Sequence, residues 1–96
     1  TMQITLPSVV NAKTETKSNI ISVTIDKDGH VFYDMEKQPT IEIIGAVKKT
    51  IAENPDSIFI IRADRNVNYF YVTDTIDSIK SAGGVHISLA AESRRQ

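Results

Sequence analysis

The chain has 96 residues, of which 41% are hydrophobic and 24% are charged, a composition typical of one small globular domain. Its 11 basic and 12 acidic residues leave a formal net charge of -1, which gives no electrostatic basis for binding nucleic acid. The absence of cysteine excludes a disulfide framework, a thiolate zinc site and a cysteine nucleophile. No run of about 18 apolar residues occurs, so no segment of this sequence is predicted to span a membrane.

Residues 1–19 are predicted to be a flexible linker that holds one strand-like piece, ITLP. Within that piece Ile4 and Leu6 lie on one side, and Pro7 ends the alternation. Residues 8–19 are mostly small and polar, as linkers are. The strand-like piece has two interpretations: a frayed terminus, or a segment that pairs with a sheet edge of its own chain or of a partner.

Residues 20–26 are predicted to form a half-buried strand, because three branched apolar residues alternate with Ser22 and Thr24. A hairpin turn follows, in which Gly29 can take a positive φ, and residues 30–34 form the return strand. The two aspartates of this turn have the spacing that begins a calcium loop. The later ligands and the terminal glutamate of such a loop are missing, which favours a plain turn.

Two helices are predicted from their end signals. The first follows Thr40, a suitable N-cap, with Glu42 near the positive end of the helix dipole, and Pro55 ends it. The second begins at the N-cap Asn68 and ends at Gly83, which suits a left-handed C-cap. Its buried stripe is predicted to consist of Tyr69, Val72, Ile76 and Ile79.

Residues 57–64 are predicted to form a central strand covered on both faces, because four successive positions are apolar. The last strand, residues 85–91, alternates, with Ile87 and Leu89 on its apolar side. The order ββαβαβ allows two right-handed crossovers between parallel neighbours. Because the first and last strands each have a polar side, both helices are expected on the other side. The prediction is an α/β (α+β) two-layer sandwich with a mixed sheet over residues 20–92 and a tail over residues 93–96.

No arrangement of side chains in the sequence indicates catalysis. His30 and His86 lie far apart and outside any metal-ligand spacing. Asp74 and Asp77 are three apart on the outer side of the second helix, where a solvated face explains them better than an acid–base pair. The sequence therefore predicts no enzyme, no cofactor and no metal site. The rival prediction, a small enzyme that uses both histidines and the carboxylates, requires the histidines to converge in one pocket.

The segment Arg62-Ala63-Asp64-Arg65 stands where the central strand gives way to a loop, a common place for functional residues. Asp64 is expected to cap the turn with its side chain. Both arginines are expected to pair with Asp64 or with a carboxylate on a partner.

Three aromatic residues follow this corner. Successive helical residues point about 100° apart, so Tyr69, Phe70 and Tyr71 cannot all be buried. With Tyr69 on the core stripe, Phe70 or Tyr71 is left exposed beside the arginines. Such a side chain is suited to contact with another protein, and incidental surface exposure is the equal alternative.

Four stretches, ITLP, VTIDKDGHVFYD, NPDSIFIIRADRNVNY and DSIKSAGGVHISLAAE, resemble the ExbD/TolR family of biopolymer transport proteins. They occur in the family's order and cover nearly the whole chain. The central stretch, in which NPD and an apolar strand precede RADRNVNY, is the most specific and is more similar to ExbD than to TolR. The sequence departs from the family pattern at Phe70-Tyr71, which puts the usual partner surface in question, and at Gly84, which is expected to loosen the turn into the last strand.

The resemblance implies a subunit of a proton-driven motor in the inner membrane. Family members have a short cytoplasmic tail, one transmembrane helix with an essential aspartate, a linker and a periplasmic domain, and this chain resembles only the last two parts. The implied partners are a second copy, a TonB-like protein, an ExbB-like membrane subunit bound through the transmembrane helix, and peptidoglycan. A TolR-like domain that binds peptidoglycan and a free soluble adaptor remain as alternatives.

The binding residues that we predict fall into three groups. The first group adds a strand to a sheet edge, in cis or across a dimer. The second shapes the corner after the central strand. The third forms the open edge, from Ile87 to Ala91, that pairs with itself or with a partner. The groups are Ile4, Leu6 and Pro7; Arg62, Asp64, Arg65, Tyr69, Phe70 and Tyr71; and Ile87 and Leu89.

Overall fold

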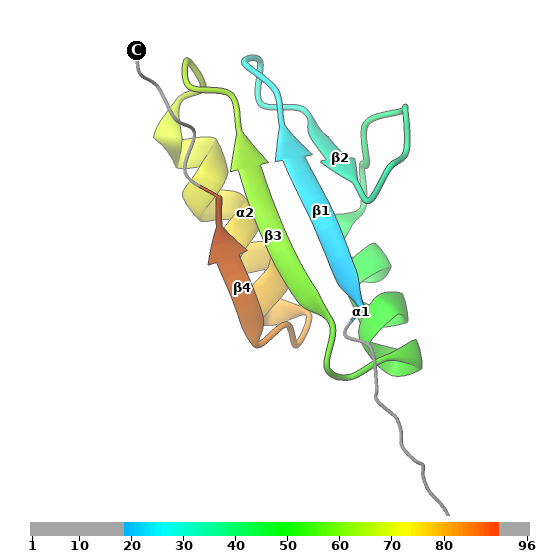
Figure 1. Ribbon diagram of the computed structural model, residues 1–96. Helices are drawn as coiled ribbons and strands as arrows, with labels where there is room; N and C mark the ends of the chain where they lie inside the picture. The colour runs from blue at the N-terminus through cyan, green and yellow to red at the C-terminus, as the bar shows by residue number, and fades with distance from the viewer. Residues whose placement is uncertain (1–18, 91–96) are drawn as a thin grey trace, which may run out of the picture.

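The computed structural model describes residues 19–90 and contains the predicted six elements in the predicted order (Figure 1). The predictions for Ile4, Leu6, Pro7, most of the linker and the tail lie outside the described residues. The elements are β1 (Ile20–Ile25), β2 (Val31–Tyr33), α1 (Ile43–Glu53), β3 (Ile58–Ala63), α2 (Tyr69–Ser81) and β4 (His86–Leu89).

The four strands form one mixed sheet in the order β2-β1-β3-β4. β1 is antiparallel to β2 and parallel to β3, and β4 is parallel to β3. The sequence predicted two crossovers between parallel neighbours, and only the one through α2 has that form. The connection through α1 joins β2 to β3, with β1 lying between them in the sheet. Because β2 is antiparallel to β1, it is also antiparallel to β3, so this connection does not join parallel neighbours. Residues 34–42 carry the chain back along β2, where the Thr40 N–H donates to the Val31 carbonyl at 2.6 Å.

Both helices lie on one face of the sheet, which confirms the predicted two layers (Figure 1). Alternate residues of β1 point into the core while Ser22 and Thr24 point to the other face. Phe59, Val47 and Ile79 are completely buried between the layers. The full set of buried apolar side chains is Ile21, Val23, Ile25, Tyr33, Val47, Phe59, Ile61, Val72, Ile79 and Ala82.

β3 is a central strand, as predicted, but helices cover only one of its faces. Phe59 and Ile61 are buried under the helices, whereas Ile58 and Ile60 lie half-buried on the opposite face. Neighbouring side chains on the sheet, rather than a second helical layer, account for this partial burial. Four apolar residues in a row therefore marked a central position without indicating cover on both sides.

The start of α1 differs from the prediction. The N-cap residue is Glu42, whose side chain makes no capping hydrogen bond, so Thr40 is not the N-cap. Instead the Thr40 hydroxyl oxygen accepts a hydrogen bond from the Tyr33 N–H at 3.1 Å. The Tyr33 N–H points away from β1 and needs a hydrogen-bond partner. The Thr40 hydroxyl provides that partner and is therefore not used to cap the helix. The end of α1 before Pro55 is as predicted.

The ends of α2 follow the prediction more closely. The Asn68 side chain accepts a hydrogen bond from the Phe70 N–H at 2.9 Å, which confirms it as the N-cap. At the other end Gly83 has a φ of 104°, and the N–H groups of Gly83 and Gly84 donate to the carbonyls of Lys80 and Ile79. These two hydrogen bonds together form a Schellman motif, which needs a residue in the left-handed conformation, and Gly83 supplies it.

Gly84 does not loosen this turn, contrary to the expectation. A Cβ atom at Gly84 would lie 2.5 Å from Cγ2 and 3.1 Å from the carbonyl oxygen of Ile79. Because that space is already filled by the core, a larger residue there would push the turn away from α2. Gly84 therefore lets the chain pass close to the helix before it enters β4.

Candidate functional site

The corner after β3 is built around Asp64, as the sequence predicted. The Asp64 N–H donates to the Ile25 carbonyl at 2.8 Å and so continues the pairing of β3 with β1. Its carboxylate accepts a hydrogen bond from the Asn66 N–H at 2.8 Å, and its carbonyl accepts one from the Val67 N–H at 3.0 Å. The side chain thus caps a tight turn, which is the usual role of aspartate at such a position.

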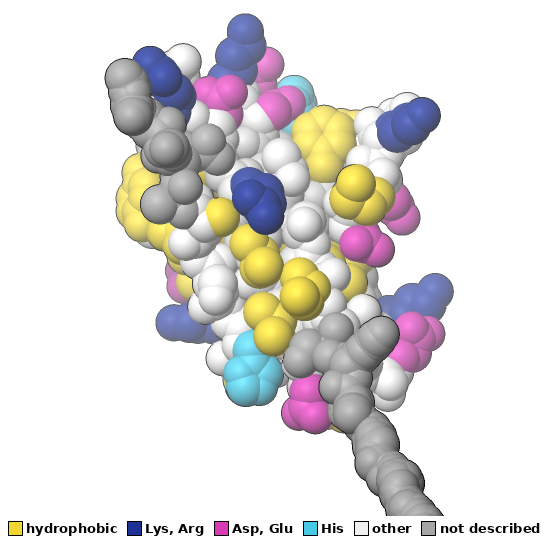
Figure 2. Space-filling view, in the orientation of Figure 1, with side chains coloured by type: hydrophobic (Ala, Val, Ile, Leu, Met, Phe, Trp, Pro, Cys, Tyr) yellow, Lys and Arg dark blue, Asp and Glu magenta, His cyan; other side chains and the backbone are white. Residues whose placement is uncertain are grey.

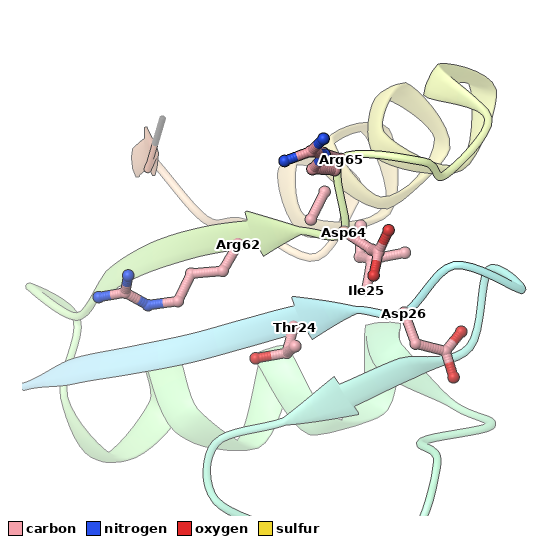
Figure 3. A pocket seen from close by; sticks show the side chains of 7 residues that line it. Thr24, Ile25, Asp26, Arg62, Asp64 and Arg65 are labelled. Carbon is pink, nitrogen blue, oxygen red and sulfur yellow. The ribbon is translucent and has the colours of Figure 1, made fainter. Parts of the chain in front are cut away.

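The arginines on either side of Asp64 do not form an ion pair with it. Within residues 19–90, the contact of this kind joins Nδ1 of His30 to the Asp26 carboxylate at 3.3 Å, and it is an ion pair when the imidazole is protonated. Figure 3 shows the Arg62 side chain running back along the sheet, away from Asp64 and Arg65. A shallow hollow lined by both arginines, Thr24, Ile25, Asp26, Ala63 and Asp64 lies at the carboxyl ends of β1 and β3. The other predicted arrangement, in which both arginines pair with a carboxylate on a partner, stays a prediction.

The aromatic residues at the start of α2 are arranged differently from the prediction. Tyr69 is 61% exposed and Phe70 is 65% exposed, whereas Tyr71 is 40% exposed. Tyr69 therefore does not hold the helix to the core. The cap at Asn68 sets the rotation of the helix so that Val72 and Thr75 face the sheet instead.

Tyr71 packs against the hairpin between β1 and β2. A Cβ atom at Gly29 would lie 2.6 Å from carbons of the Tyr71 ring, so the ring rests on a position that only glycine leaves open. Gly29 has a φ of 89°, as the turn prediction requires. The rings of Phe70 and Tyr71 meet edge to face with centroids 6.0 Å apart. All three aromatic side chains at this corner are thus exposed, Tyr71 the least.

Thr75 is a core residue that the sequence prediction missed. It is buried, and its hydroxyl group donates to the Tyr71 carbonyl at 2.8 Å. This bond satisfies the hydroxyl within the helix, which allows a polar side chain to face the apolar layer. Helical spacing could have predicted this burial, because Thr75 falls on one stripe of the helix with Val72, Ile79 and Ala82.

β4 is an edge strand whose outer backbone groups have no strand partner within residues 19–90. The Ala90 N–H donates to the Ile61 carbonyl at 2.9 Å. Because the hydrogen-bonding groups of alternate residues point to opposite sides of a strand, those of Ile87 and Leu89 point away from β3. Their side chains share the face of Phe59 and Ile61, with which they are in register, yet Leu89 is 50% exposed. The predicted residues Ile87 and Leu89 therefore lie at an accessible sheet edge.

The opposite edge, at β2, is closed by its own chain. Val31 and Tyr33 are the residues whose backbone groups point away from β1, because their neighbours make the bonds of the hairpin. Thr40 meets both, through its N–H to the Val31 carbonyl and its hydroxyl oxygen from the Tyr33 N–H. The Tyr33 carbonyl accepts from the Glu36 N–H at 3.2 Å, so of the outward groups of Val31 and Tyr33 only the Val31 N–H has no partner among residues 19–90, whereas no hydrogen bond within these residues reaches the outward groups of β4.

Comparison with known proteins identifies the family of this chain. The family model described as Biopolymer transport protein ExbD/TolR matches residues 1–94. The chain belongs to the ExbD/TolR family. A protein of Synechocystis sp. (strain ATCC 27184 / PCC 6803 / Kazusa), whose name assigns it to the ExbD biopolymer transport proteins, is 29% identical over 70 residues. That match covers 71% of this chain and 25% of the relative, so the chain spans a fraction of the relative's length.

The ExbD/TolR assignment confirms the predicted family and agrees with the mixed four-stranded sheet and its two helices. The family description names transport of biopolymers and no catalytic activity. None of the helices within residues 19–90 is both long enough and apolar enough to cross a membrane.

The two histidines of this ExbD/TolR domain lie at opposite ends of the sheet. His86 is in register with Ile58 at the start of β3, whereas His30 adjoins Asp26 beyond the carboxyl end of β1. The rival enzyme required them to converge in one pocket, and they do not.

Asp26, Asp28 and His30 place ligand atoms within 4.8 Å of one another in the hairpin turn. The Asp26 carboxylate is already engaged, because one oxygen accepts from the N–H groups of Asp28 and His30, each at 2.9 Å. Its other oxygen lies 3.3 Å from Nδ1 of His30. Desolvation opposes ionisation of Asp26, but these backbone bonds and the imidazole outweigh it, so the pKa of Asp26 lies below its ordinary value. The carboxylate serves the turn, as the sequence predicted.

Proposed function

We propose that this chain is the periplasmic domain of an inner-membrane subunit of a motor of the TonB–ExbB–ExbD type, driven by the proton-motive force. In this proposal the domain is not an enzyme. It takes part in energy transduction for outer-membrane uptake by dimerising and by binding a TonB-like protein. An ExbB-like subunit is contacted through a transmembrane helix outside this chain. Membership of the ExbD/TolR family is the first support for this proposal.

The observation that carries the binding role is the difference between the two sheet edges. β4 offers the outward backbone groups of Ile87 and Leu89, while on β2 Thr40 already pairs with the Val31 carbonyl and the Tyr33 N–H. An extended segment of a partner can add to such an edge, gaining main-chain hydrogen bonds along its length. The half-exposed Leu89 side chain supplies an apolar anchor beside those bonds.

The exposed aromatic rings of Tyr69 and Phe70 extend the proposed binding surface at the corner. Both stand at the start of α2, after the turn that Asp64 caps. Aromatic and arginine side chains are enriched at protein interfaces, so Arg65 together with these rings suits contact with protein. The segment of Ile4, Leu6 and Pro7 is proposed to supply a strand to an edge in cis or across the dimer.

The test is Leu89→Gln in the full-length protein. We expect uptake that depends on the motor to be lost while the amount of protein in the membrane stays unchanged, because glutamine removes the apolar anchor but preserves the strand. His86→Gln on the same strand is the matched control and should retain uptake, since its side chain lies on the other face. Normal uptake by Leu89→Gln would refute the role of this edge.

Two alternatives are separated by direct measurements. If the purified chain co-sediments with isolated cell wall, and Leu89→Gln does not change this, a TolR-like domain that binds peptidoglycan replaces the motor proposal. Cell fractionation addresses the free soluble adaptor. A native protein in the membrane fraction supports the motor subunit, and one in the soluble fraction with the mass of this chain supports the adaptor.

A further inference from the structure

The turn between β1 and β2 gathers three side chains that can bind a metal ion. Asp26, Asp28 and His30 each place one ligand atom within 4.8 Å of the others. Asp26 is half-buried, whereas Asp28 and His30 are exposed and can be reached from solvent. Figure 2 shows a histidine at each end of the sheet, and the upper one adjoins acidic side chains. Two carboxylates and an imidazole thus meet at the surface of one hairpin.

The Asp26 carboxylate divides its two oxygens between the turn and the imidazole. Oδ1 accepts the two backbone N–H groups of the turn, whereas Oδ2 lies 3.3 Å from Nδ1 of His30. A hydrogen bond between an ionised imidazole and a carboxylate is shorter, at about 2.7–2.9 Å. Two ligand atoms on a tetrahedral zinc ion, each about 2.0–2.1 Å from the metal, lie roughly 3.3 Å apart. Oδ2 and Nδ1 therefore have the separation that a shared zinc ion requires.

The backbone of the turn holds Asp26 and His30 in place before any ion binds. The Asp26 N–H donates to the His30 carbonyl at 3.0 Å, and the His30 N–H donates back to the Asp26 carboxylate at 2.9 Å. Between them the Gly29 N–H donates to the Asp26 carbonyl at 3.0 Å and closes the turn. Ordering side chains lowers the affinity for a ligand, and here only the Asp28 side chain remains to be ordered. The site is therefore largely preorganised.

The kinds of ligand atom in this turn favour a transition-metal ion over calcium. Ca²⁺ takes about six to eight oxygen ligands, and the turn offers the carboxylates of two residues only. Imidazole nitrogen together with carboxylate oxygen suits Zn²⁺, which is usually bound by four ligands. Asp26, Asp28 and His30 supply three of them, and water supplies the fourth. The sequence predicted no metal site, because it does not show the approach of His30 to Asp26.

We propose that Asp26, Asp28 and His30 form a surface site for a divalent transition-metal ion, with Zn²⁺ as the ion that fits best. The proposed function includes no such ligand, and the site is separate from the β4 edge. It adjoins the aromatic corner, because the Tyr71 ring rests on Gly29 in the same turn. An ion held by Asp28 and His30 fixes both neighbours of Gly29. Metal binding therefore also steadies the surface on which the Tyr71 ring packs.

The test is calorimetric titration of the 96-residue chain, without a histidine tag, with zinc chloride. We expect His30→Gln and Asp28→Asn each to raise the Kd for Zn²⁺ by about tenfold or more, since loss of even a supporting group has such an effect. Both changes preserve the backbone bonds to the Asp26 carboxylate, so both variants should fold. His86→Gln is the matched control, because it removes the other histidine, and it should bind Zn²⁺ like the wild type. Amide NMR signals of residues 26–30 should change when Zn²⁺ is added.

Several results would overturn this inference. They are a wild-type chain that binds no Zn²⁺ at millimolar concentration, and a His30→Gln variant that binds it as tightly as the wild type. Loss of binding in His86→Gln, with His30→Gln unaffected, would place the ion elsewhere. Displacement of Zn²⁺ by an equal concentration of Ca²⁺ would show a site made of oxygen atoms alone. The uptake assay of Leu89→Gln is independent of these outcomes, so failure of the metal site is distinguishable from failure of the proposed function.

Discussion

The two edges of the sheet differ in how they treat their outward backbone groups, although both end in short strands. β2 is three residues long, and the segment that follows it returns so that Thr40 pairs with two backbone groups on its outer side. β4 is four residues long, and nothing in residues 19–90 returns to its outer side. An exposed strand edge promotes unwanted pairing, and proteins usually protect such edges. Because this domain protects the β2 edge with its own chain and leaves the β4 edge accessible, a partner strand can add at β4 more readily than at β2.

The largest effect is expected at the entry to the open edge, with Gly84→Ala. The new methyl group would overlap Ile79, and we expect the free energy of unfolding to fall by about 1–3 kcal/mol. Urea unfolding measures this loss. Gly45→Ala on α1 is the control, because alanine favours the helix by roughly 0.5–1 kcal/mol and its nearest contact is the flexible Glu42 side chain. Equal stability of both variants would show that the Gly84 turn is not tightly packed.

A smaller effect is expected at the closed edge, with Thr40→Val. This change removes the hydroxyl oxygen that accepts the Tyr33 N–H, and we expect a loss of about 1 kcal/mol. The amide of Tyr33 should also exchange its hydrogen faster, which NMR can measure. Thr40→Ser, which keeps the oxygen, should retain the slow exchange. Unchanged exchange in Thr40→Val would mean that Thr40 does not close this edge.

The smallest effect is a pH dependence confined to the closed side. Since the pKa of Asp26 is lower in the folded chain than its ordinary value, ionised Asp26 stabilises the hairpin at pH values above that ordinary value. This contribution is lost as the pH falls through the folded pKa. Asp26→Asn keeps an oxygen acceptor and cannot ionise. We therefore expect the thermal unfolding temperature of the wild type to fall more steeply with decreasing pH than that of Asp26→Asn below about pH 4. Parallel curves would contradict this.

Local signals in the sequence predicted the elements well and their tertiary contacts less well. The Asn68 cap, the Gly29 turn and the positive φ of Gly83 depend on neighbouring residues only, and each was predicted correctly. Thr40 was predicted as a helix cap, because its use by β2 depends on a loop that returns to the strand. Pairing across such a loop has no local sequence pattern.

The candidate site shows the same division. The turn at Asp64 was predicted from its residue type. Alternation placed Leu89 on the apolar side of the last strand, and its half-exposure comes from the position of β4 at the sheet edge. Tyr69 was placed in the core because an aromatic side chain at the start of an apolar stripe is a strong signal. The cap fixes the rotation of α2 and gives that place to Val72 and Thr75. A polar residue satisfied within its own helix, as Thr75 is, cannot be distinguished from a solvated one by type alone.

The parallel pairing of β1 with β3 has a mechanical consequence. Six register pairs join these strands, from Ile20 with Ile58 to Ile25 with Ala63. The chain enters β1 at one end of the sheet, and β4 ends at the other (Figure 1). Tension between these two ends runs along the strands, so it loads the slanted hydrogen bonds between β1 and β3 together instead of peeling them one after another. The domain is therefore built to resist pulling along this axis more than pulling across it.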